Sequence, residues 1–483
     1  MQITMFDGTK RFKIDKPIRL ISLFSGYDSQ FFSLKYLGAN VKSWRTCEWA
    51  IKSIQALKDA HFKDDNTDYS QGLSDWGIFE QLYKCGISAN YNEPMTYEQI
   101  KRLGIVKARQ IFSNIIATRN MVNIQQVHAE DLGIEETDKY CYVMTYSFPC
   151  QDLSLAGKGA GMEKGSGTRS GMLWEVERIL DELSGYIPHR HKPINPRIHS
   201  MTPYVDWYQK ADTTKLPQVL LMENVPEVIG TNNIKHFAKW LEKLESLGYH
   251  CYWQVLNAKD YGVPQNRERC FMVSVLGDYY YEFPRPIKLE HRLKDLLEDE
   301  VDEKYYLSDR IVNYYQNHSK DAEKQGNGFR FAPIENCDVV AKTITTRAGS
   351  RMDDNFIKIT NGKTKVIKNL KTKLCNELIK SNRVQEYDVI RHSYSTSRME
   401  NMYIQNQTNH DCSPTLDTRC DCLGVVKDYR IRKLTPKECF RLMGVKDQDF
   451  ENIAQNQSNA SLYHLAGDSI VVDVLMEIFK QML

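Results

Sequence analysis

Hydrophobic and polar positions follow two alternating patterns between residues 18 and 278. Six short runs are rich in β-branched and aromatic residues, and longer runs with apolar residues at helical spacing separate them. The six runs read IRLISLF, VKSWRTCEW, CYVMTYSF, QVLLMENV, HCYWQVLNA and RCFMVSVLG. This alternation predicts an α/β fold with a mainly parallel, doubly wound sheet that has helices on both faces. Such sheets bind ligands at the carboxyl ends of their strands, so we expect the functional residues there.

Two segments interrupt this alternation. Within residues 61–128 a helix is expected to start at Thr96, where Gln99 completes a capping box. Its apolar stripe consists of Ile111, Phe112, Ile115 and Ile116. We interpret this segment as a peripheral helical insertion. Residues 183–217 contain five prolines and few apolar residues, which predicts a long loop insertion at the surface.

The charge of the chain changes after Pro286. Residues 281–340 carry a net charge of −4, whereas residues 341–400 carry +7. Such a shift predicts a domain boundary and a basic surface, although a solvated lysine-rich face would have the same composition. Residues 343–347 (TITTR) are echoed by residues 415–419 (TLDTR), and both read as short β elements. From Leu434 the pattern is helical again, beginning at Thr435 and Pro436.

Composition narrows the class of protein. The chain has 483 residues, of which 41% are hydrophobic and 26% charged, the balance of an ordinary globular protein with two or three domains. No apolar run approaches the roughly 18 residues of a membrane span, so we expect a cytoplasmic protein that does not enter a membrane. The 12 cysteines form no C-x-x-C pair, which indicates reduced thiols. A net charge of +2 restricts any nucleic-acid surface to a local patch.

Candidate functional residues follow the first two predicted strands. The first runs into LFSGYDSQ, a small-residue turn before a helix, which suits a nucleoside-bearing cofactor. The second ends in Glu48 and Trp49, an acceptor for ribose hydroxyls beside an aromatic plate for a base. Taken alone, a carboxylate such as Glu48 is more often an ordinary surface residue.

Three further strand ends carry reactive or charged side chains. Pro149 and Cys150 end the strand CYVMTYSF and precede a glycine-rich stretch, the placement of a nucleophile, although most cysteines are buried apolar residues. Glu223 ends a very apolar strand, where a carboxylate needs a partner. In QNRER, Arg267 and Arg269 alternate along a strand and so point to one face. A cysteine, a glutamate and two arginines at strand ends suit recognition of an anion or a nucleobase.

The ordered motifs resemble those of the cytosine carbon-5 DNA methyltransferases of bacteria and phages. They are LFSGYDS, CEW, SFPCQDLS, RSGMLW, MENV, QNRER, LTPKECFRLMG and LAGDSIVVDVL, and they cover residues 18–278 and 430–475. The resemblance implies a Rossmann-like methyltransferase domain over residues 1–280 and a target-recognition domain over 281–429. It also implies that residues 430–483 return to the methyltransferase domain, with the last helix on the first strand.

The resemblance implies S-adenosyl-L-methionine as cofactor and assigns its pocket. The implied residues are Phe24, Ser25, Gly26, Tyr27, Asp28, Ser29, Glu48, Trp49, Asp131, Leu132, Pro149, Leu173, Asp468 and Ser469. Two positions depart from the family pattern. The turn lacks two glycines that the family usually has, and Asp468 stands in GDS where the family usually has asparagine. These departures bear on the affinity for the cofactor.

The resemblance also implies a covalent mechanism on a flipped-out cytosine. Cys150 would add to carbon 6, so that carbon 5 attacks the sulfonium methyl group. Glu223 would hold ring nitrogen 3 and the exocyclic amine, and Arg267 and Arg269 would hold the base carbonyl and a phosphate. No residue can be assigned as the base that removes the carbon-5 proton.

Double-stranded DNA is the expected partner, bound by a monomer, with a cognate restriction endonuclease as a separate protein. The basic stretch would contact phosphates and the domain over 281–429 would select the target. An RNA cytosine-5 methyltransferase is an alternative, because a related branch uses the same residues on transfer RNA. A catalytically inactive DNA-binding subunit is another, although it would be expected to have lost at least one of Cys150, Glu223, Arg267 and Arg269.

Overall fold

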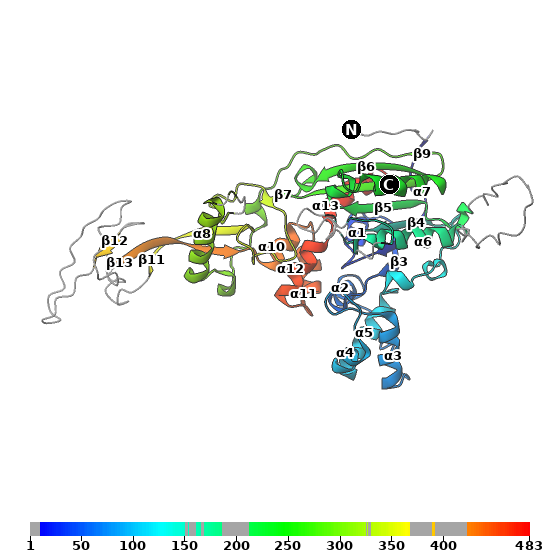
Figure 1. Ribbon diagram of the computed structural model, residues 1–483, viewed down its shortest axis with the longest axis horizontal. Helices are drawn as coiled ribbons and strands as arrows, with labels where there is room; N and C mark the ends of the chain where they lie inside the picture. Colours follow the sequence, from blue (N-terminus) through cyan, green and yellow to red (C-terminus); the bar gives the residue numbers. More distant parts are fainter. Residues whose placement is uncertain are drawn as a thin grey trace, which may run out of the picture. The chain divides into compact units, whose positions relative to one another are not determined.

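The computed structural model describes residues 10–149, 153, 161–165, 169–185, 212–324, 326, 330–367, 389–391 and 423–483. The chain forms two compact units (Figure 1). Unit 1 comprises Met1–Leu296, Val340–Thr346 and Pro436–Leu483, and unit 2 comprises Leu297–Val339 and Arg347–Thr435. The boundaries expected from the sequence differ in that 281–296 and 340–346 belong to unit 1 and 430–435 to unit 2.

The centre of unit 1 is a six-stranded sheet in which every predicted strand is present. Its order is β3 (Val41–Cys47), β2 (Ile18–Leu23), β4 (Cys141–Tyr146), β5 (Val219–Asn224), β8 (Glu268–Leu276) and β6 (Tyr249–Asn257). The first four strands are parallel, and β8 runs antiparallel to both of its neighbours. The predicted mainly parallel α/β sheet is therefore confirmed. In a separate two-stranded sheet, β1 (Lys10–Arg11) pairs in parallel with β9 (Tyr279–Tyr280).

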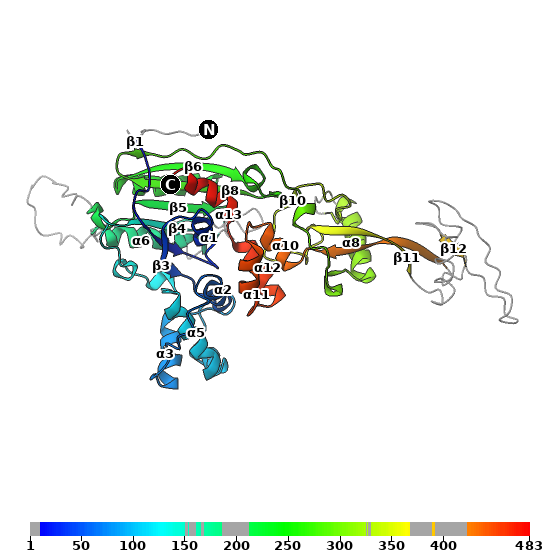
Figure 2. The same cartoon turned by 180° about the vertical axis from the view of Figure 1, so that it is seen from behind.

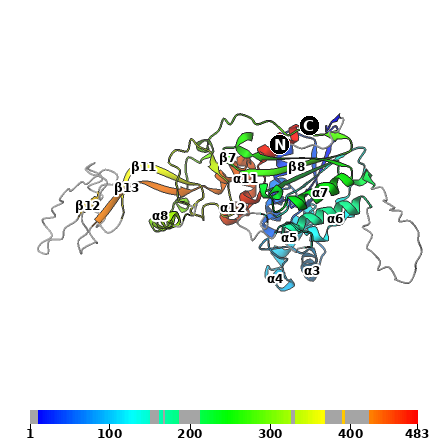
Figure 3. The same ribbon diagram turned by 45° about the horizontal axis from the view of Figure 1, so that its top comes forward.

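Helices cover both faces of this sheet (Figures 2 and 3). On one face α6 (Leu173–Leu183) and α7 (Ile234–Ser246) pack in one apolar core with side chains of β2, β4 and β5. On the other face α1 (Ser29–Tyr36) and α13 (Val472–Lys480) pack against each other. Because both faces are covered, all residues of β4 and β5 are buried. The last helix therefore lies against α1.

The helical insertion forms a subdomain with its own apolar core. It follows α2 (Ile51–His61) and contains α3 (Asp75–Cys85), α4 (Tyr97–Arg102) and α5 (Ile105–Ala117). The capping box of Thr96 and Gln99 is present. The helix capped by Thr96 is α4, which ends before the predicted apolar stripe begins. Gly104, with a φ of 78°, separates α4 from α5, and the stripe lies on α5. Ile111 and Ile115 are buried as predicted, but Ile116 is 43% exposed, so its place in the stripe was wrong.

The last part of unit 1 returns to the sheet through short elements. β10 (Ala341–Lys342) pairs in parallel with β7 (Gln265–Asn266), and this pairing places residues 340–346 in unit 1. Residues 343–347 themselves form no strand, contrary to the sequence pattern, and residues 415–419 lie outside the described part. α10 (Pro436–Arg441) starts as predicted, and α11 (Asp447–Ala454) and α12 (Asn459–Asp468) follow it.

In the part that the structure describes, unit 2 has one α-helix packed against a three-stranded antiparallel sheet. α8 (Asp309–Lys324) contributes Val312 to a small core with Phe356 and Ile431. The strand order is β11 (Phe356–Ile367), β13 (Leu423–Lys433) and β12 (Val389–Arg391). Neither unit, as far as its residues are described, has a helix with the length and apolar character to cross a membrane.

Candidate functional site

A cavity of about 380 Å³ opens at the carboxyl edge of the sheet in unit 1. Leu23 is paired with Cys47 on one side and Tyr146 on the other, so the ends of β2, β3 and β4 are level. Ten of the fourteen predicted cofactor residues line this cavity: Phe24, Ser25, Gly26, Tyr27, Ser29, Glu48, Trp49, Pro149, Asp468 and Ser469. Its volume is in the range of small-molecule sites.

The turn between β2 and α1 is built on left-handed backbone conformations. Phe24, Gly26 and Asp28 have φ values of 55°, 54° and 61°. Asp28 tolerates this conformation and caps α1, since its Oδ1 accepts from the N–H of Phe31 and the hydroxyl of Ser22. Asp28 is therefore fully buried beneath the turn and does not line the cavity. Burial raises the pKa of its carboxyl group to about 7.

Glu48 is held rigidly at the end of β3. Its Oε2 accepts from the N–H of Gly26 at 3.0 Å, and its Oε1 accepts from the N–H of Ala50 at 2.8 Å. The side chain of Asn120 bonds to both the N–H and the C=O of Glu48. Burial raises the pKa of Glu48 to about 7. Glu48 is thus an oriented acceptor that faces the cavity beside Trp49, not an ordinary surface carboxylate.

The helical insertion contributes a wall that the sequence did not reveal. Tyr91, Asn123, Ile124 and Gln125 all line the cavity. The chain returns from α5 alongside the free edge of β3, where Asn120 bridges Thr46 and the N–H of Met121 bonds to the C=O of Thr46. The insertion is therefore not merely peripheral. No periodicity or motif in residues 61–128 signals this contact.

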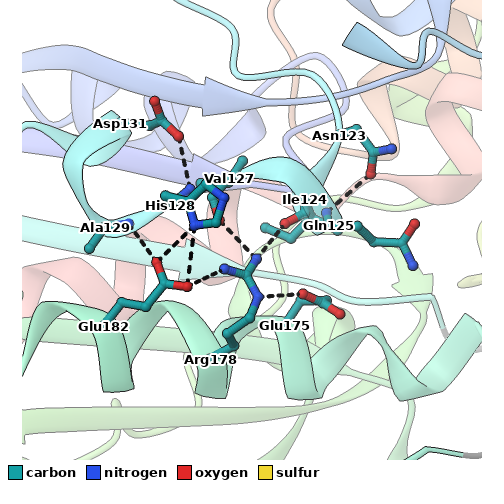
Figure 4. A network of polar contacts seen from close by, with 10 residues as sticks. All are labelled: Asn123, Ile124, Gln125, Val127, His128, Ala129, Asp131, Glu175, Arg178 and Glu182. Carbon is teal, nitrogen blue, oxygen red and sulfur yellow. Dashed lines mark hydrogen bonds and ion pairs between the residues drawn. The ribbon is translucent and has the colours of Figure 1, made fainter. Parts of the chain in front are cut away.

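A charged network holds this wall against α6 (Figure 4). Arg178 donates to the carbonyl oxygens of Ile124 at 3.1 Å and Val127 at 2.8 Å. Its guanidinium group also pairs with Glu175 and Glu182 on the same helix. Glu182 in turn accepts from the main-chain N–H of Ala129 at 3.0 Å, and its carboxylate lies 3.2 Å from Nδ1 of His128. The network connects the buried helix to the backbone that lines the cavity.

Three predicted cofactor residues have structural positions instead. Asp131 accepts from the N–H of His128 through Oδ2 and so caps a short turn outside the cavity wall (Figure 4). Leu132 and Leu173 are fully buried in the core beneath the sheet. The lining positions near them are taken by Asn123 and by Met172. Residue spacing alone could not distinguish the capping acid from a cavity residue.

The carboxylate of Glu223, at the end of β5, lies beside the cavity. Glu223 is 5% exposed, and its Oε1 lies 3.1 Å from Nε of Arg269. Its Oε2 accepts from the hydroxyl of Ser147, which also lines the cavity. The partner expected for this buried carboxylate is therefore present. Cys150 lies outside the described residues, although Pro149 before it lines the cavity and its carbonyl accepts from Ser170.

Arg267 has a different environment from Arg269. It is 3% exposed and donates to the carbonyl oxygens of Ile344, Gly467 and Ser469, each at 2.9 Å. These bonds fasten the C-terminal end of α12 and the segment after β10 to the sheet. The structure therefore brings Glu223 and Arg269 together and shows Arg267 bonded to main-chain carbonyls. The role in substrate binding that the resemblance implies for Arg267 stays a prediction.

The C-terminal segment closes the cavity. The hydroxyl of Tyr27 donates to Oγ of Ser469 at 2.7 Å, which ties the turn after β2 to the residue after α12. Gly467 packs so closely that a Cβ there would lie 2.2 Å from the main-chain nitrogen of Thr346. His464 and Asp468 line the cavity one helical turn apart. The described residues contain no cluster of side chains able to hold a metal ion.

Comparisons with known proteins identify the family of this chain. The family model for C-5 cytosine-specific DNA methylases matches residues 95–188 and 205–483. Type II methyltransferase M2.ScrFI of Lactococcus lactis subsp. cremoris is 29% identical over 96% of this chain and 99% of its own length. Orphan methyltransferase M.SssI of Spiroplasma monobiae is 31% identical over 61% of this chain and 69% of its own length.

Solved structures show the same fold. The crystal structure of a Spodoptera frugiperda DNMT2 mutant matches with a TM-score of 0.50 and 14% identity, over 96% of this chain and 98% of that one. At this identity the likeness concerns the fold alone. The family match extends over most of the chain, and the relatives are named type II and orphan methyltransferases. The chain therefore belongs to the C-5 cytosine-specific DNA methylase family and is a DNA (cytosine-5-)-methyltransferase.

Proposed function

We propose that unit 1 binds S-adenosylmethionine in its cavity and methylates cytosine in double-stranded DNA through a covalent adduct on Cys150. One observation carries this proposal. Ser147 lines the cavity and also donates to Glu223, so the cofactor cavity adjoins the Glu223–Arg269 pair. A methyl donor and a cytosine held in these two places would be neighbours, as direct transfer requires.

The residues present fit S-adenosylmethionine. Trp49 offers an aromatic surface for adenine, and the oriented carboxylate of Glu48 suits the hydroxyls of a ribose. The described lining residues include three carboxylates, those of Glu48, Glu93 and Asp468, and one guanidinium group, that of Arg169. This balance suits a positively charged ligand. When bound, the cofactor supplies an electrophilic methyl group on a cationic sulfur.

The chain's own residues would activate the cytosine. The thiolate of Cys150 adds to carbon 6, and carbon 5 then becomes nucleophilic. Glu223 holds ring nitrogen 3 and the exocyclic amine, which stabilises the charge that develops on the ring. Arg269 keeps Glu223 oriented through their 3.1 Å contact and supplies a donor for the base carbonyl. Arg267 maintains the wall and leaves Arg269 as the arginine next to the base.

The test compares nucleic acids and variants. The purified protein is incubated with a tritiated methyl donor and duplex DNA, the same DNA as single strands, or transfer RNA. We expect incorporation into duplex DNA, located by bisulfite sequencing, and loss of more than 99% of activity in Cys150→Ser. DNA containing 5-fluorocytosine should form a denaturant-resistant adduct with the wild type and not with Cys150→Ser. Methylation of transfer RNA alone, or an active Cys150→Ser variant, would overturn the proposal.

Unit 2 would choose the target sequence. Support comes from the net charge of +7 in residues 341–400 and from the placement of the cavity wholly in unit 1. If Arg347 contacts a phosphate, Arg347→Ala should lower affinity evenly across sequences and reduce the salt slope by about one. Arg310→Ala, in the acidic part of unit 2, is the matched control. An unchanged slope in both variants would argue against a phosphate contact by Arg347.

The protein would act as a monomer and without a bound endonuclease. Light scattering of the protein on duplex DNA should give one chain per target site. A site-specific activity that requires a second protein would contradict this part of the proposal.

A further inference from the structure

Glu223 is held at both of its carboxylate oxygens by side chains. Its Oε1 lies 3.1 Å from Nε of Arg269 on β8, and its Oε2 accepts from the hydroxyl of Ser147, directly after β4. Glu48 differs, because both of its oxygens accept from main-chain N–H groups. The orientation of Glu223 therefore depends on two side chains that single substitutions can remove.

The backbone around Ser147 is fixed against β5. In the parallel pairing of β4 and β5, Tyr146 lies opposite Met222, so the next residues of the two strands are neighbours. One residue further on, Nδ2 of the buried Asn224 donates to the carbonyl oxygen of Phe148 at 2.9 Å. The hydroxyl of Ser147 therefore reaches the carboxylate from a position that is itself held in place.

The two contacts of Glu223 have different tasks in the proposed reaction. A carboxylate turns readily about its last side-chain bond, because that torsion has only broad minima. Cytosine presents ring nitrogen 3 and its exocyclic amine in one plane, so the carboxylate must lie in that plane to reach both. Arg269 would also donate to the base carbonyl, whereas the hydroxyl of Ser147 has Glu223 as its acceptor. Ser147 is therefore the contact that serves Glu223 alone.

We propose that Ser147 is a positioning residue that sets the plane of the Glu223 carboxylate for methyl transfer. This inference rests on the proposed role of Glu223 in holding the cytosine. Loss of the Ser147 hydroxyl should slow the chemical step, because stabilisation of the charge that develops on the ring depends on an oriented carboxylate. Binding of the methyl donor should be almost unaffected, because an alanine at this position still lines the cavity wall.

Single-turnover kinetics and binding calorimetry on the full-length protein test the inference. Ser147 is only half-buried on the cavity wall, so Ser147→Ala should fold, and Ser147→Gly removes the same hydroxyl as a second variant. We expect the rate constant of methyl transfer to duplex DNA to fall about 10- to 100-fold in both. The dissociation constant of S-adenosylmethionine should stay within about twofold of the wild-type value.

Thr145→Val is the matched control. Thr145 lies on β4 two residues before Ser147 and is buried, and its hydroxyl has no hydrogen-bond partner among the described residues. Its removal should leave both the transfer rate and the donor affinity near the wild-type values, because no oriented group loses a contact.

A double-mutant cycle with Glu223→Ala tests whether Ser147 acts through Glu223. If it does, adding Ser147→Ala to Glu223→Ala should slow transfer by less than about threefold. An unchanged transfer rate in Ser147→Ala, an equal loss of donor affinity and rate, or losses that multiply in the double variant would each overturn the inference. Full activity of Glu223→Ala would instead overturn the proposed role of Glu223, so the two failures are distinguishable.

Discussion

Unit 1 and unit 2 differ in how much buried structure supports their strands. The sheet of unit 1 is covered by helices on both faces, and its strand ends are level around one cavity. In the described part of unit 2, the core consists of Val312, Phe356 and Ile431 with a few partly buried neighbours. Methyl transfer requires groups held within fractions of an ångström, which a large core provides. Selection of a target sequence, the role proposed for unit 2, requires mainly a surface, which a smaller core can present.

The largest expected effect comes from the closest main-chain contact in unit 1. Gly467→Ala should lower the free energy of unfolding by about 3 kcal/mol, because the new methyl group would meet the main chain of Thr345 and Thr346. Denaturant titration measures the loss. Gly77→Ala, in the exposed part of α3, is the control and should be neutral or slightly stabilising. Equal stability of the two variants would refute the close packing.

Core truncations in the two units should separate their functions. Ile431→Ala removes a buried side chain from the small core of unit 2 and should cost about 3 kcal/mol of that unit's stability. Cofactor binding by calorimetry should remain. Ile179→Ala, in α6 of unit 1, should instead weaken both stability and cofactor binding. Loss of cofactor binding in Ile431→Ala would show that the units do not function separately.

Loss of the Arg178 contacts to the cavity wall should weaken cofactor binding more than it lowers the stability of the fold. Arg178→Met removes the donors to Ile124 and Val127 while keeping an apolar stem, and we expect about tenfold weaker cofactor binding. Arg109→Met is matched, because Arg109 also donates to two main-chain carbonyls but braces the insertion away from the cavity. Equal affinities in the two variants would remove Arg178 from the pocket's support.

The effect that is smallest near neutral pH and grows gradually on acidification comes from His61. The Nε2–H of His61 donates to the carbonyl oxygen of Tyr27 at 2.8 Å beneath the turn between β2 and α1, and burial lowers the pKa of His61 from 6.5 to about 3. The folded state therefore binds this proton less readily than the unfolded state. Stability should be fully present above pH 6.5 and fall by at most about 1.4 kcal/mol per pH unit below it. His61→Phe should show a shallower acid slope in urea titrations, and an identical slope would contradict the assignment.

The strand pattern carried most of the fold because the central strands β4 and β5 are buried on both faces. A run such as QVLLMENV can only be a central strand or a buried helix, and the helical runs between them resolve that choice. Glu48 and Glu223 were also recognisable, since each directly ends such a strand. In contrast, Asp131 looked like a cofactor residue, and only the turn it caps explains its presence. Its role was implied by the family resemblance, whereas Asn123, earlier in the same segment, lines the cavity.

The sequence by itself determined the order of strands along the chain, the family and the strand-end residues, because these depend on local periodicity and short motifs. Tertiary structure alone decided which arginine braces and which faces Glu223, because the carbonyls that bind Arg267 come from two distant segments. The same holds for the stack of Tyr91 on His464, which joins the insertion to α12. Contacts between remote segments depend on how packed elements meet, and no local pattern encodes that meeting.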